Sequence, residues 1–117
     1  MAIKNAFKLT VVFFCTEHGT EPVRDWLKSL SADDRQKIGQ DIKTVQIGWP
    51  LGMPLVRSLG DDLWEVRTNL DNRIARVIFF TWKNNMVLVH GFIKKTQQTL
   101  KQDLELAKKR KHFFLTL

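Results

Sequence analysis

Apolar positions in the first half of the chain change their spacing after one short segment. Residues 7–14 (FKLTVVFF) are β-branched and aromatic with partial alternation, which predicts a strand. The apolar positions that follow recur at helical spacing, and Pro22 and Ser31 stand where a first helical turn and an N-cap are expected. We therefore predict two consecutive amphipathic helices, whose apolar stripes are Val23, Trp26, Leu27 and Leu30 in the first and Ile38, Ile42, Val45 and Trp49 in the second.

Between residues 59 and 93 the spacing of apolar positions becomes two, which is typical of strands. Two turns of two residues, Asp71 with Asn72 and Asn84 with Asn85, are predicted here because Asp and Asn tolerate positive φ. The turns separate three predicted strands over residues 63–68, 74–82 and 86–93.

A further helix is predicted from about Thr99, which has capping-box spacing to Gln102. The order β-α-α-β-β-β-α over residues 1–117 then predicts a single α+β domain. In this domain we expect an antiparallel sheet with helices packed on one face and a basic C-terminal helix.

Strand register decides which side chains share a face of that sheet. With the two predicted turns, Arg67 lies directly opposite Arg76, and like charges in that position are destabilising. An anionic ligand between the two arginines would relieve the repulsion, while Glu65 offers a purely structural partner. We expect helices to cover the face of Trp64, Val66, Ala75, Val77, Phe79, His90 and Phe92, and the face of Leu63, Glu65, Arg67, Arg76, Ile78, Phe80 and Trp82 to stay open.

Composition and net charge limit the classes of protein to which this chain can belong. The 117 residues are 44% hydrophobic, enough for a packed core, and carry a net charge of +7. Cys15 stands alone, which excludes an internal disulfide and multi-cysteine metal centres, and no segment reaches the length of a membrane helix. We expect a cytoplasmic protein that needs neither a metal nor a cofactor.

The positive charge is concentrated toward the C-terminal end of the chain. Lysine and arginine in a predicted helix could bind the phosphates of a nucleic acid, or could simply form a solvated helix end. The residues concerned are Lys101, Lys108, Lys109, Arg110 and Lys111. Nearer the sheet, Lys94 and Lys95 could both approach a phosphate, and His90 could transfer a proton or be a hydrogen-bonded core histidine.

Four segments together resemble a known family. Residues 63–67 (LWEVR), 75–80 (ARVIFF), 89–97 (VHGFIKKTQ) and 105–110 (ELAKKR) resemble the RelE/HigB superfamily of toxins, and within it the phage-derived HigB-like subgroup. The resemblance implies a RelE-like fold. It also implies the toxin of a type II toxin–antitoxin pair, an endonuclease that cleaves messenger RNA on the ribosome and so inhibits translation.

The resemblance also implies roles for particular residues. Relatives use the 2′-hydroxyl of the RNA as nucleophile, without a metal. Arg67 and Arg76 would hold the scissile phosphate, and of Lys94 and Lys95 one would transfer a proton and the other bind phosphate. Secondary candidates for the catalytic site are Glu65, Arg73 and His90.

Partners and alternatives follow from the same comparison. The expected partners are the ribosome with its mRNA and a cognate antitoxin, a small helix-turn-helix protein.

Leu100 stands where the subgroup usually has proline, and the chain has no tyrosine, so a phenol cannot take part in catalysis. Phe113 or Phe114 could replace tyrosine only in stacking on a base. Two alternatives stay open: a ParE-like inhibitor of DNA gyrase, or a non-catalytic basic RNA-binding module.

Overall fold

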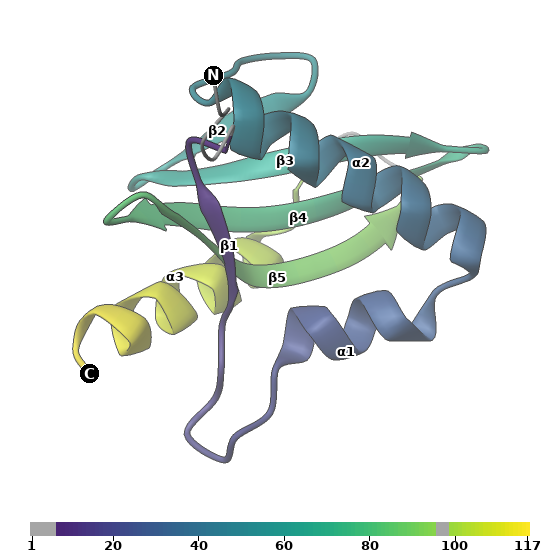
Figure 1. The fold of residues 1–117 in the computed structure, drawn as a ribbon. Coiled ribbons are helices and arrows are strands. Elements are labelled where there is room, and N and C mark those ends of the chain that lie inside the picture. Colours follow the sequence, from purple (N-terminus) through teal and green to yellow (C-terminus); the bar gives the residue numbers. More distant parts are fainter. Residues whose placement is uncertain (1–6, 96–98) are drawn as a thin grey trace, which may run out of the picture.

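The computed structural model, which describes residues 7–95 and 99–117, is built on one five-stranded sheet (Figure 1). The strands lie in the order β1-β5-β4-β3-β2. Their bounds are Thr10–Phe13 for β1, Val56–Gly60 for β2, Leu63–Leu70 for β3, Arg73–Trp82 for β4 and Asn85–Lys94 for β5.

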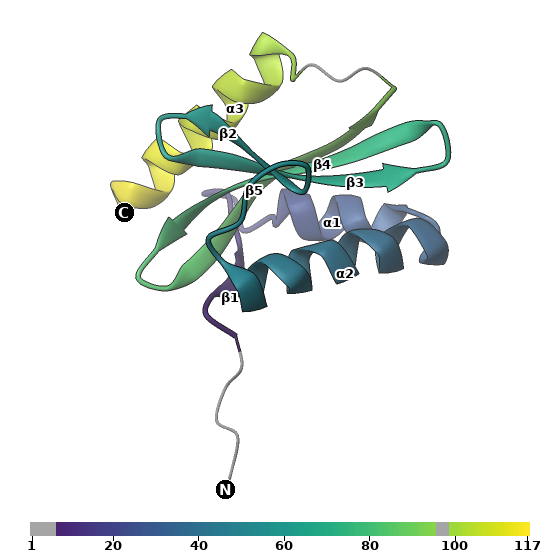
Figure 2. The same ribbon diagram turned by 90° about the horizontal axis from the view of Figure 1, so that it is seen from above.

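Three helices flank the sheet, and they lie on opposite faces of it (Figure 2). Helices α1 (Pro22–Ser29) and α2 (Ala32–Gly48) cover one face, and α3 (Lys101–Leu115) crosses the other. Ser31 is the N-cap of α2 as predicted, since its side chain accepts a hydrogen bond of 3.2 Å from the backbone N–H of Asp34. The predicted α+β class is therefore confirmed. No helix in the described part of the chain is long and apolar enough to cross a membrane.

Two features of the sheet differ from the prediction. Strand β2 was not predicted, because its five residues follow a loop with two prolines and alternate too briefly to be recognised. The sheet is mixed and not wholly antiparallel, because β1 pairs with β5 in the parallel direction. The chain passes from β1 through α1 and α2 to β2 at the far edge and reaches β5 only through the following strands, so no hairpin connects β1 to β5 and the two can pair in parallel.

The register is correct in one hairpin and wrong in the next. Leu70 pairs with Arg73 across the predicted turn, and Arg67 lies opposite Arg76 as expected. In the second hairpin Trp82 pairs with Asn85, so the loop lies one residue earlier than predicted. The register then shifts again between Ile78 and Phe79, because Val89 is an extra residue in β5 and forms a β-bulge.

This bulge moves His90 and Phe92 to the other face of the sheet. They were predicted on the face with Trp64, but His90 pairs with Ile78 and Phe92 with Arg76. Cross-strand partners point to the same side of a sheet. His90 therefore shares a face with the arginines.

Each face of the sheet carries its own hydrophobic core. The core under α1 and α2 includes Ile38, Val45, Val66, Val77 and Phe79. The second core, under α3, includes Phe14, Leu63, Ile78, Phe80, Val87, Val89 and Ala107. The face predicted to stay open is therefore partly covered, because the apolar side of α3 packs against it.

Candidate active site

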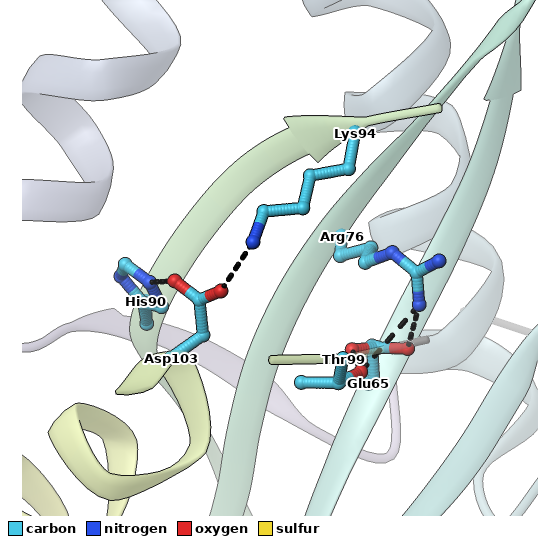
Figure 3. Close-up of polar contacts among 6 residues, drawn as sticks. All are labelled: Glu65, Arg76, His90, Lys94, Thr99 and Asp103. Carbon is cyan, nitrogen blue, oxygen red and sulfur yellow. Dashed lines mark hydrogen bonds and ion pairs between the residues drawn. The ribbon is translucent and has the colours of Figure 1, made fainter. Parts of the chain in front are cut away.

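The start of α3 and the residue before its N-cap meet the sheet at two polar clusters, and Figure 3 draws six of their residues, without Arg67. The first is centred on Glu65, a fully buried carboxylate on β3. Glu65 accepts a hydrogen bond of 3.0 Å from Arg76 Nη1 and one of 2.5 Å from Thr99 Oγ1. Arg67 Nε lies 3.9 Å from the same carboxylate. One carboxylate is thus shared between the two opposed arginines.

Electrostatics at Arg67 reflect this crowding. Burial lowers the pKa of Arg67, the positive charge of Arg76 lowers it further, and Arg57 contributes in the same direction. Glu65 acts in the opposite sense. Arg67 remains protonated because the ordinary pKa of arginine is so high. Its positive charge is nevertheless disfavoured by the charges of the neighbouring arginines, and an added anion would relieve that repulsion.

The second cluster is centred on Asp103, in the first turn of α3. Its Oδ1 lies 2.8 Å from His90 Nε2, and its Oδ2 accepts a hydrogen bond of 2.9 Å from Lys94 Nζ. Burial by itself would raise the pKa of Asp103, but the hydrogen bonds from His90 and Lys94 outweigh it, and the net pKa lies below its ordinary value. Asp103 is therefore an ionised carboxylate that holds an imidazole and an ammonium side by side.

The ionised state of Asp103 fixes the imidazole. Because a carboxylate only accepts hydrogen bonds, His90 Nε2 must carry the proton between them, which leaves Nδ1 free to accept one in the neutral ring. The ring of Phe92 lies against both groups, with its centroid 5.2 Å from the His90 ring and 5.2 Å from Lys94 Nζ. Imidazole and ammonium are thus held by a carboxylate on one side and an aromatic ring on the other.

Comparison with known proteins places the chain in a family. Residues 25–112 match the family described as Phage derived protein Gp49-like (DUF891). The chain belongs to this family. Gp49-like proteins are among the RelE/HigB-like toxins of toxin–antitoxin systems, so a cognate antitoxin is the implied partner. No curated protein matches the chain at a significant level.

The two clusters of this Gp49-like chain bring together most of the residues predicted for catalysis. Glu65, Arg67 and Arg76 form one cluster, and His90 and Lys94 belong to the other. Arg76 differs from expectation, because it was placed on an open face and is fully buried. The prediction judged exposure from the alternation of residues alone. It did not include the contacts of Arg76 with Glu65 and Thr99, which accompany its burial.

Two predicted catalytic residues lie outside the clusters. Arg73 faces the other side of the sheet, where its Nη2 lies 3.1 Å from Asp34 Oδ2 and ties β4 to α2. Lys95 is exposed just after the end of β5. Thr96 and Gln97, which complete the motif of the resemblance, lie outside the described residues.

Thr99 and Asp103 were missed as members of the site. Thr99 was predicted as the N-cap of the last helix, but Leu100 takes that position and Thr99 turns its hydroxyl to the sheet. Asp103 was given no role in the prediction. A signal was available, since Asp103 and Glu105 are the two acids of a very basic segment that begins with Lys94 and Lys95.

The basic residues of α3 divide into two groups. Lys101 and Lys109 are exposed, whereas Lys108, Arg110 and Lys111 also dock the helix. Lys108 Nζ lies 3.0 Å from a carboxylate oxygen of Asp61, and Lys111 donates to the backbone carbonyl of the same residue. Arg110 Nη1 donates a hydrogen bond of 2.7 Å to the carbonyl of Val89, the bulged residue of β5, and burial lowers the pKa of Arg110.

The arrangement suits proton transfer beside an anion. His90, with 15% of its side chain exposed, and Lys94, with 24%, can exchange protons with a bound molecule, and Arg67 supplies a fixed positive charge nearby. Among the residues that the structure describes, no group of three histidine, cysteine or acidic side chains could hold a metal ion.

Proposed function

We propose that this Gp49-like protein is the toxin of a type II pair, of the HigB-like subgroup, and cleaves messenger RNA on the ribosome in the cytoplasm. The observation that supports this most is the His90–Asp103–Lys94 cluster on the same face of the sheet as Arg67, because together they offer a proton acceptor, a proton donor and a phosphate ligand on one face. Nucleases that use a 2′-hydroxyl as nucleophile need these three functions.

The steps can be assigned to atoms. His90 Nδ1 takes the proton of the 2′-hydroxyl, and the oxygen then forms a bond to the adjacent phosphorus. The bond from phosphorus to the 5′-oxygen breaks, and Lys94 donates a proton to that oxygen. The products are a 2′,3′-cyclic phosphate and a 5′-hydroxyl. Arg67 and the exposed Lys95 hold the phosphate as charge accumulates on its oxygens.

Three residues act on the site indirectly in this proposal. Asp103 orients both proton-transfer groups, and Glu65 with the buried Arg76 holds Arg67 in place. Arg76 contacts no phosphate while it is buried. The exposed lysines of α3, Lys101 and Lys109, contribute charge toward ribosomal RNA, and a small helix-turn-helix antitoxin blocks this face.

The experiment compares induced expression of the wild type, the double variant Lys94→Ala/Lys95→Ala and the control Arg24→Ala, which lies on α1 across the sheet. We expect growth arrest and new mRNA 5′ ends with the wild type and the control only, and no cuts when translation is blocked. A purified ribosome complex then reports whether the upstream fragment ends in a cyclic phosphate.

Two results would contradict the proposal. Arrest with intact mRNA and inhibited supercoiling would identify a gyrase inhibitor. Arrest with intact mRNA and protein retained on ribosomes would identify a non-catalytic RNA-binding module.

A further inference from the structure

The β-bulge in β5 puts two consecutive side chains on one face of the sheet. Val89 belongs to the core under α3, and the next residue, His90, contacts Asp103 of the same helix (Figure 3). A regular strand would turn consecutive side chains to opposite faces. The bulge is therefore what brings the imidazole to the face on which the candidate site lies.

The regular pairing of β5 is blocked from the other face of the sheet. Gly91 pairs with Val77 and lies against Trp26 of α1, where even a Cβ would come within 2.4 Å of the indole. Without the extra residue His90 would take that place, because a shift of one residue turns every following side chain to the opposite face. An imidazole does not fit there, so Trp26 excludes the pairing that lacks the bulge.

The bulge also leaves a backbone carbonyl in need of a partner. Val89 is fully buried and has no cross-strand partner on β4, and β1 pairs with β5 only as far as Leu88. The carbonyl of Val89 instead accepts a hydrogen bond of 2.7 Å from Arg110 Nη1. Because a buried backbone oxygen without a partner is costly, Arg110 stabilises the bulged conformation of β5.

Arg110 is directed to this contact by its position on α3. Asp103, Ala107 and Arg110 are spaced four and three residues apart, so they lie along the same side of the helix, and Ala107 is fully buried against the sheet. The guanidinium carbon lies 5.8 Å from the centroid of the Phe14 ring, and burial lowers the pKa of Arg110. This arginine thus differs from an exposed cation such as Lys109, whose charge is solvated.

We propose that Arg110 is a positioning residue: it fixes the bulge through the carbonyl of Val89, and the bulge directs the imidazole of His90 toward Asp103 and the substrate. The inference rests on the proposed function for the part of His90 in proton transfer. Helix α3 then holds His90 at two points, at its ring through Asp103 and at the preceding carbonyl through Arg110. This role requires no contact between Arg110 and RNA.

The state of the imidazole in the free protein tests this inference without any chemistry. Long-range proton–nitrogen NMR shows which ring nitrogen carries the proton, and His90→Gln identifies the signals of His90. In alkaline buffer the wild type should show the form protonated at Nε2, since Asp103 accepts from that nitrogen. Arg110→Met keeps the apolar stem and removes the donor, so it should give a mixture of both ring forms. Arg110→Lys restores a donor on a long side chain and should return the ring to the Nε2 form.

Single-turnover cleavage on purified ribosome complexes separates positioning from RNA binding. Arg110→Met should lower kcat about 10-fold or more with little change in KM, because a small displacement of a proton-transfer group is costly. Lys109→Met is the matched control, since it removes an exposed charge one residue earlier on the same helix. It should raise KM and leave both kcat and the His90 signals as in the wild type.

Urea unfolding shows whether each variant is folded. If Arg110→Met is not, Arg110→Gln takes its place, because the shorter glutamine side chain should not reach the carbonyl of Val89. A folded variant without the donor that keeps either the Nε2 form or the kcat of the wild type would overturn the inference, and so would one that only raises KM, as Lys109→Met does. If the imidazole changes as expected but the wild type cuts no mRNA, the positioning of His90 stands and the nuclease proposal fails separately.

Discussion

Glu65 and Arg76 form an ion pair of 3.0 Å between adjacent strands, with both side chains fully buried. Isolated charges at such a depth are strongly disfavoured, so each is held in place by the other. The pair lies at the middle of the candidate site, yet its burial makes Arg76 a poor direct ligand for RNA. The same two side chains therefore join β3 to β4 beneath the candidate site.

Arg76→Ala is expected to destabilise the fold strongly. Removing one partner leaves the carboxylate of Glu65 buried without its closest cation, which costs about 3–5 kcal/mol in the free energy of unfolding. Arg67→Ala should cost much less, because 11% of that side chain is exposed and its contact with Glu65 is longer. Urea unfolding of the two variants checks this. Equal and small losses of stability in both would contradict the burial of Arg76.

Sequence patterns recovered the parts of the fold that depend on local rules. Pro22 and Ser31 marked the two helix starts, and Asn72 marked a turn, where it has a φ of 56°. The second hairpin was displaced because the positive φ values fall on Lys83 and Asn84, whereas two consecutive asparagines suggested Asn84 and Asn85. A lysine at positive φ carries no signal in the sequence.

The site depends on contacts between segments, which local patterns do not contain. The bulge at Val89 places His90 on the face of the arginines, and the carbonyl of Val89 is satisfied by Arg110 from α3. Only the packing of α3 on this face brings Asp103 to His90 and Lys94. The sequence therefore indicated candidate residues for a site but not which of them meet.

The carboxylate of Asp103 should make stability depend on pH in the acid range. Its pKa in the folded protein lies below the ordinary value of 3.8, so its contribution is fully present above that value and is lost as the pH falls through the folded pKa. The free energy of unfolding of the wild type should exceed that of Asp103→Asn near neutral pH. The difference should shrink below about pH 4. Denaturant unfolding across this range measures it, and a difference that does not vary with pH would exclude an ionised Asp103 as its source.

Gly91 is expected to be required for packing and not for chemistry, although it lies between His90 and Phe92. A Cβ at this position would lie 2.4 Å from Cε3 of Trp26, on α1. Gly91→Ala should therefore cost about 1–3 kcal/mol in the free energy of unfolding, because the indole ring must move.

A double-mutant cycle with Trp26→Ala isolates the steric cause. With the indole removed, Gly91→Ala should cost clearly less than it does in the wild type. Equal costs in the two backgrounds would show that α1 does not pack against β5 in this way.

The two adjacent lysines should differ in their effect on cleavage. Lys94 Nζ is bound to Asp103 and lies over Phe92, whereas Lys95 is exposed beyond the end of the strand. Lys94→Met keeps the apolar stem of the side chain and removes the ammonium, so it should lower kcat about 10²-fold or more with little effect on KM. Lys95→Met, the same change one residue later, should mainly raise KM, since in the proposed mechanism it removes a phosphate contact and no proton-transfer group. Single-turnover cleavage of mRNA on purified ribosome complexes separates the two parameters. If Lys95→Met lowers kcat and Lys94→Met does not, the proton donor has been assigned to the wrong lysine. The contact with Asp103 would then have no part in the reaction.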